Sequence, residues 1–125
     1  DRLQGLALAH SGHYAEAAQL LEKLLAADPR DGDLHETLAQ CLTDSNEPAM
    51  WQQALTRWRE LERNTRPGTP RWFRAKYGLA AASEKLGNKD YAAKLIKVTS
   101  VLHPDLGGEA LKAKFEQLLK RCEGG

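Results

Sequence analysis

The chain has 125 residues, of which 42% are hydrophobic and 28% charged, and its formal net charge is +1. This size and balance favour one soluble domain, and no apolar run approaches the roughly 18 to 20 residues that cross a bilayer. The charge is uneven, because residues 1–56 carry 3 basic and 9 acidic side chains whereas residues 57–76 carry 7 basic and 2 acidic ones. Such a polarised surface bears on the choice of partner more than on the fold.

The cysteines and the start of the chain constrain its compartment only weakly. Cys41 and Cys122 form no pair at metal-binding spacing, so the sequence indicates neither a disulfide framework nor a zinc site. We expect Cys41 to pack inside and Cys122 to be a free thiol near the chain end. The chain begins with Asp1 and shows no leader pattern, so we interpret it as a fragment or processed form that is cytoplasmic or periplasmic.

The hydrophobic periodicity predicts a succession of helices over residues 2–11, 14–27, 33–44, 47–64, 70–86, 89–102 and 108–122. Short polar side chains that can accept from a free amide of the first turn precede the third, fourth and sixth of these, namely Asp31 or Asp33, Asn46 and Asn88. Thr69 precedes Pro70, which suits the first helical position. The last helix places Leu111, Phe115, Leu118 and Leu119 on one stripe, so we expect it to cover the end of the fold.

The sequence repeats itself at a shift of 75 residues. The shift superimposes small, large and helix-ending residues, namely Gly12 on Gly87, Ala17 on Ala92, Leu20 on Leu95, Leu21 on Ile96 and Pro29 on Pro104. A stretched copy lies between the two, because a shift of 34 carries Gly5 to Ala39 and Leu8 to Leu42, whereas Ala17 and Leu21 need 37 to reach Ala54 and Trp58. The chain therefore contains three units with short insertions.

These units resemble the tetratricopeptide repeat family, whose 34-residue unit is a pair of antiparallel helices with small residues where they cross. The first unit carries the pattern best, through Gly5, Leu8, Gly12, Tyr14, Ala17, Leu21 and Pro29. The departures are Gln4, where a large apolar residue is usual, and Thr99 and Ser100, where the first unit has leucines. The resemblance implies an all-α superhelical stack in one domain, residues 1–125, with hairpins near 1–31, 32–68 and 69–104 and a capping helix at 108–122.

The resemblance implies a scaffold that binds a peptide or a partner domain and performs no catalysis. The first helix of each hairpin would line a concave face, and by register its partner-binding residues are Arg2, Leu6, His10, Glu36, Thr37, Gln40, Arg74, Tyr77, Ala81 and Lys85. Some family members hold the C-terminal carboxylate of chaperones with basic and amide side chains. At those positions only Arg2 and Arg74 would serve here, so the partner is not assigned, although the basic residues suit an acidic one.

Two alternatives use other residues. The segment 57–76 interleaves basic and aromatic side chains, which would suit single-stranded nucleic acid by stacking and phosphate contacts, although Trp58 falls on a core position. The tripeptide His103, Pro104 and Asp105 resembles the loop of J-domain co-chaperones, yet Leu106 follows where that family has lysine.

No catalytic, cofactor-binding or metal-binding constellation is indicated. His10 and His13 are three residues apart, but no third ligand is placed near them, and phosphate-loop and nucleophile motifs are absent from the sequence. The style of the repeats favours a bacterial parent protein. Leu3 and Leu6 in the opening turns would be covered by a preceding hairpin in that parent, so we expect weak self-association through this edge.

Overall fold

The computed structural model describes residues 4, 5, 7, 8 and 12–124. Its helices are α2 (Tyr14–Ala27), α3 (Gly32–Asp44), α4 (Pro48–Arg63), α5 (Pro70–Lys85), α6 (Lys89–Leu102) and α7 (Glu109–Gly124). Residues 4, 5, 7 and 8 are also helical, and no strand occurs within the described ranges. The all-α fold that the periodicity predicts is confirmed.

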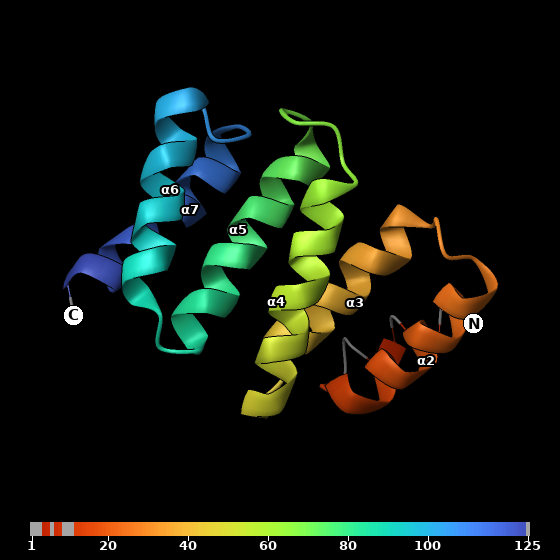
Figure 1. Ribbon diagram of the computed structural model, residues 1–125. Helices are drawn as coiled ribbons and strands as arrows, with labels where there is room; N and C mark the ends of the chain where they lie inside the picture. The colour runs from red at the N-terminus through yellow and green to blue at the C-terminus, as the bar shows by residue number, and fades with distance from the viewer. Residues whose placement is uncertain (1–3, 6, 9–11, 125) are drawn as a thin grey trace.

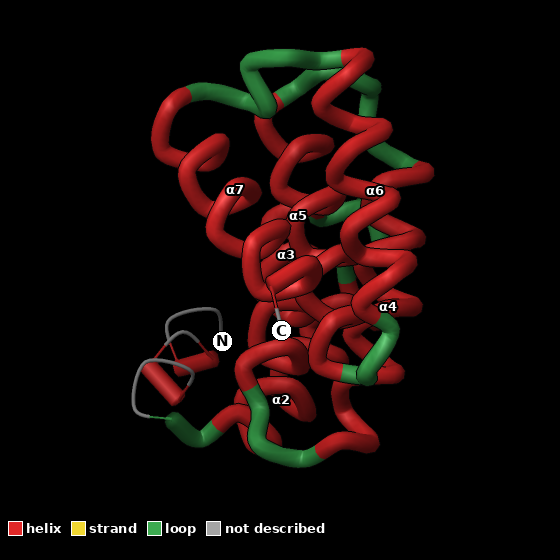
Figure 2. Tube along the Cα trace, turned by 90° about the vertical axis from the view of Figure 1, so that its left-hand side faces the viewer, coloured by secondary structure: helices red, strands yellow, loops and turns green. Residues whose placement is uncertain are grey.

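The helices form a stack in which each packs against the next along the chain (Figure 1). Two further contacts join helices two places apart, α3 with α5 and α5 with α7. Figure 2 shows that α3, α5 and α7 lie on one side of the stack while α4 and α6 lie on the other. We call the side of α3, α5 and α7 the inner face, which corresponds to the predicted concave face, and the side of α4 and α6 the outer face.

The helix starts differ in how they are capped. Asp31 caps α3 as predicted, because its carboxylate accepts from the Leu34 amide at 3.1 Å. The prediction that Asn46 caps α4 is wrong. Pro48 occupies the first turn, where its missing N–H costs nothing, so Glu47 becomes the N-cap residue and its amide donates to the Ser45 hydroxyl at 3.1 Å.

Two other predicted caps keep their positions without the expected bond. Thr69 and Asn88 are the N-cap residues of α5 and α6, but neither side chain accepts from a first-turn amide. The Thr69 hydroxyl instead donates to the Arg66 carbonyl at 2.7 Å, which fastens the turn between α4 and α5.

A first core fills the space among α2, α3, α4 and α5. Trp58 is 1% exposed, and its indole N–H donates to the Thr43 hydroxyl at 2.8 Å. Its ring lies against Gly78 of α5, where any Cβ would overlap the indole. Cys41 is also buried, as predicted, and burial together with the nearby charge of Asp44 raises the pKa of its thiol to about 11. This core therefore depends on one large ring fitted against a glycine.

A second core joins α5, α6 and α7. Phe115 and Leu118 of α7 are fully buried against Ala92 and Ile96 of α6, so the predicted covering helix does cover this end. Thr99 is buried in α6 where the first unit has a leucine, and its hydroxyl donates to the Leu95 carbonyl at 2.7 Å. Bonding within its own helix lets this polar departure from the repeat pattern sit inside the fold.

Candidate functional site

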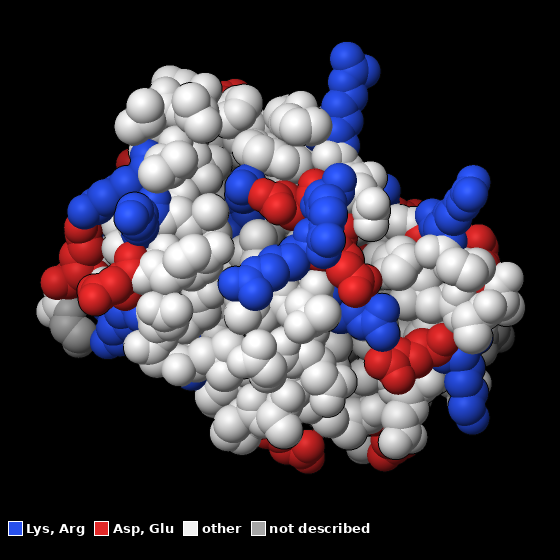
Figure 3. Space-filling model, in the orientation of Figure 1, with Lys and Arg blue, Asp and Glu red and all other residues white. Residues whose placement is uncertain are grey.

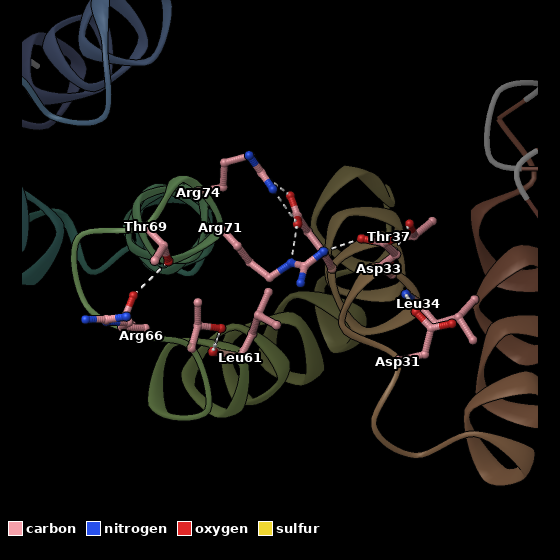
Figure 4. Close-up of polar contacts among 11 residues, drawn as sticks. Asp31, Asp33, Leu34, Thr37, Leu61, Arg66, Thr69, Arg71 and Arg74 are labelled. Carbon is pink, nitrogen blue, oxygen red and sulfur yellow. Dashed lines mark hydrogen bonds and ion pairs between the residues drawn. The ribbon is translucent and has the colours of Figure 1, made fainter.

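An ion-pair network joins α3 to α5 on the inner face, and it includes two of the predicted partner-binding residues (Figure 4). Arg74 donates two bonds to the Glu36 carboxylate, one of them from Nη2 to Oε1 at 3.1 Å. Arg71 donates from Nε to the same Oε1 at 3.2 Å and from Nη2 to Asp33. The two arginines of α5 thus hold two carboxylates of α3.

The network changes the protonation equilibrium of its central carboxyl. Burial by itself raises the pKa of Glu36, but the hydrogen bonds and charges of Arg74 and Arg71 outweigh it and hold that pKa below its ordinary value of 4.5. The pairing also raises the pKa of Arg74, chiefly through its hydrogen bond with Glu36. This part of the inner face is therefore charged but internally neutralised at pH 7.

Other predicted residues on α3 bond within their own helix. The Thr37 hydroxyl donates to the Asp33 carbonyl at 2.8 Å. The Gln40 side chain is exposed and donates to Asp44 Oδ1 at 3.0 Å. Gln40 is exposed on this face, whereas the Thr37 hydroxyl proton is already used within the helix.

The predicted residues on α5 have different surroundings. Tyr77 is half-buried, and its ring is perpendicular to the Phe115 ring of α7, with ring centroids 5.3 Å apart. Ala81 is half-buried against the second core. The Lys85 ammonium donates to the Thr43 carbonyl near the end of α3 and lies 5.6 Å from the centroid of the Trp51 ring. Lys85 therefore fastens α5 to the end of α3.

The remaining predicted residues, Arg2, Leu6 and His10, lie outside the described residues, as does Leu3, on which the predicted self-association depends. The groove-lining role of the described members stays a prediction. The structure brings Glu36 and Arg74 together, and it places Lys85 at the far end of α5.

Sequence reasoning missed a cavity of about 380 Å³ between the start of α5 and the start of α7. Arg74 and Lys114 contribute its cationic groups, and the turn through Gly107 and Gly108 forms another wall. Both glycines have positive φ, and a Cβ on Gly107 would lie 2.9 Å from Cβ of Phe73. The Gly-Gly pair was the available signal, because two adjacent glycines before a helix indicate a special turn.

The basic segment 57–76 is largely paired within the fold. Arg57 bonds Glu22 at 3.3 Å, and Lys76 pairs with Glu62 while lying 5.0 Å from the centroid of the Trp72 ring. The aromatic rings that would stack on bases are buried, with exposures of 1% for Trp58, 8% for Trp72 and 4% for Phe73. The segment therefore presents cations without accessible rings. On the face drawn in Figure 3, Lys and Arg side chains are interspersed with Asp and Glu side chains.

The tripeptide His103, Pro104 and Asp105 forms the turn after α6. The His103 ring packs against Trp72 and Phe73, at centroid distances of 5.1 and 5.2 Å, while Pro104 and Asp105 are exposed. In this fold the histidine thus takes part in an aromatic cluster that ties the turn to α5.

Two negative findings apply to the described residues alone. They contain no group of three or more histidine, cysteine, aspartate or glutamate side chains placed to hold a metal ion. None of the helices bounded there has both the length and the apolar character that a membrane crossing requires.

Comparison with known proteins identifies one match. The family model described as tetratricopeptide repeat matches residues 8–66, which include α2, α3 and α4. Searches of the curated proteins and of the solved structures found no match. The match covers most of the first two units, and the later helices continue the same alternation of inner and outer positions (Figure 2).

Proposed function

Because the chain belongs to the tetratricopeptide repeat family through residues 8–66, we propose that it binds a segment of a partner protein along its inner face and performs no chemistry of its own. Tetratricopeptide repeats generally mediate interactions between proteins, and stacked repeats offer an extended surface for this purpose. The inner face of α3, α5 and α7 is that surface in this chain.

The observation that carries the proposal is a set of exposed polar side chains on the helices of the inner face. Gln40 presents an amide on α3, Arg74 presents a guanidinium on α5, and Lys114 presents an ammonium from α7 beside the cavity. The network with Glu36 fixes the position of Arg74 in advance, which lowers the conformational entropy lost on binding. Lys114 has no ion pair within the described part of the chain, so its charge is available to an acidic side chain of the partner.

Peptide selection followed by mapping tests the proposal. A random peptide library is selected on the immobilised chain, and the selected peptide is titrated into ¹⁵N-labelled protein. We expect the amide shifts to gather on the inner sides of α3, α5 and α7. Shifts confined to the outer sides of α4 and α6 would contradict the proposal.

A matched pair of charge reversals sharpens the test. Lys114→Glu places the wrong charge beside the cavity, whereas Lys112→Glu makes the same change on α7 about 200° around the helix. We expect Lys114→Glu to weaken the selected peptide roughly tenfold and Lys112→Glu to leave its affinity unchanged. Equal affinities for both variants would show that the peptide does not use the cavity.

A further inference from the structure

The outer face of α6 exposes an apolar stripe. Val98 is 51% exposed, Val101 78% and Leu102 69%, while Tyr91 on the preceding turns is 37% exposed. The large hydrophobic residues that are exposed within the described part of the chain all fall between residues 86 and 102. The helix that carries these residues, α6, lies on the side of the stack away from α3, α5 and α7 (Figure 2).

The stripe runs along the helix axis. Tyr91, Val98 and Leu102 are separated by seven and four residues, which places them on one side of α6. Val101 lies beside them on the last turn. A contiguous apolar surface on an otherwise polar face marks an interaction site more often than scattered single residues do.

The fold does not require apolar residues at these positions, as the other repeats show. At the shift of 75, Tyr91, Val98 and Leu102 correspond to Glu16, Lys23 and Ala27 of α2, all of them exposed. At the further shift of 37, the corresponding residues are Gln53 and Glu60 of α4 and Asn64, which follows the end of α4. The equivalent positions in the other two repeats thus hold polar or small residues where α6 is apolar, so packing within the stack does not explain the stripe.

One edge of the stripe carries charged side chains and borders a groove. Lys94 and Lys97 follow this edge, with Lys97 paired to Glu123 of α7 and Lys94 without an ion pair in the described ranges. Beside them a groove of about 520 Å³ lies between α6 and the end of α7, and its lining residues include Val98, Lys94, Asp90 and Glu123. Lys94 lies about 60° around the helix from Tyr91 and Asp90 about 100°, so the lysine is the charged residue closer to the stripe. A ridge beside a groove is the shape on which a helix packs.

We propose that the outer face of α6 binds an amphipathic helix of another protein, whose apolar side covers Tyr91, Val98 and Leu102 and whose acidic side chains meet Lys94. The charge beside the stripe distinguishes between possible partners, because a carboxylate of the partner would neutralise Lys94, which has no ion pair in the described ranges. A second copy of the chain paired through the same stripe would bring lysines to that edge. This site is separate from the inner face and does not rest on the function proposed for it.

The variant that tests the proposal takes its residues from the first repeat. Val98→Lys with Leu102→Ala gives α6 the residues that α2 carries at Lys23 and Ala27, so the fold tolerates them at this register. The probe is a synthetic helical peptide with leucines along one side and glutamates flanking them. We expect the wild-type chain to bind it and the double variant to bind about tenfold more weakly, by fluorescence anisotropy.

Matched controls separate this site from the others. A twin peptide with lysines in place of the glutamates should bind the wild-type chain more weakly. Arg63→Ala on α4, at the register of Val101, and Lys114→Glu on the inner face should both leave the affinity for the acidic peptide unchanged. Circular dichroism verifies that each variant is folded.

Four outcomes would overturn the proposal. The acidic peptide fails to bind the wild-type chain, or it binds the double variant equally well. Sedimentation reveals a dimer of the wild-type chain that the double variant does not form, which would make the occupant a second copy. The wild-type chain fails to bind the peptide but floats with vesicles of phosphatidylserine and phosphatidylcholine, and the double variant does not float, which would make the occupant a lipid surface.

Discussion

The two junctions of the inner face, α3 with α5 and α5 with α7, occupy equivalent places in the stack and are held by different interactions. At the first, Arg71 and Arg74 together hold Asp33 and Glu36, and the Trp58 ring lies against Gly78 nearby. At the second, the ring contact of Tyr77 with Phe115 is accompanied by one ion pair, Arg121 with Glu84 at 3.0 Å. The repeat architecture therefore determines where two helices meet, but it does not determine which side-chain interactions hold them together.

Phe115 is the largest fully buried side chain that α7 contributes, so its truncation should give the largest loss of stability. Phe115→Ala leaves a cavity in the second core and should cost about 3 to 5 kcal/mol. Because each repeat contacts only its neighbours, we expect α7 to detach before the first core unfolds. The three tryptophans lie on α4 and α5, so their fluorescence should change at higher urea than the circular dichroism signal.

Leu119→Ala is the control for this comparison, because Leu119 is half-buried on the same helix and its truncation should cost less. Coincident urea transitions by both probes in Phe115→Ala would contradict the idea that the second junction yields first.

The α3–α5 junction is tested by Gly78→Ala. A methyl group at this position overlaps the Trp58 ring, which is fully buried and cannot turn away freely, so we expect a loss of about 3 kcal/mol. The urea midpoint should fall by both probes together, because the first core itself is strained. Gly124→Ala, which has open space around its Cβ, serves as the neutral control. An unchanged midpoint in Gly78→Ala would mean that Trp58 has another position available.

The sequence predicted the helices and their pairing better than it predicted the side-chain contacts of the candidate site. The repeat predicted Ala17 and Ala92 as helix crossings, and both are fully buried. It did not predict that Arg71 joins the network, because an ion pair depends on the angle and distance at which two helices cross. It did not predict that Lys85, whose place in the groove stays a prediction, donates to a carbonyl at the end of α3. Periodicity reports which side of a helix is buried, and it carries no information on which exposed side chains meet.

The smallest expected effect concerns the ion pairs themselves. Glu36→Gln removes the carboxylate that both arginines share, and because Glu36 is only partly buried we expect a loss of about 1 kcal/mol at pH 7. The pKa of Glu36 is lowered by folding, so its contribution is present above the ordinary value of 4.5 and is lost as the pH falls through the folded value. The difference in unfolding free energy between wild type and variant should therefore vanish in acid. Glu84→Gln removes the single pair of the other junction and should cost less. If Glu84→Gln proved the more destabilising variant at pH 7, the ranking of the two junctions by their ionic contacts would be reversed.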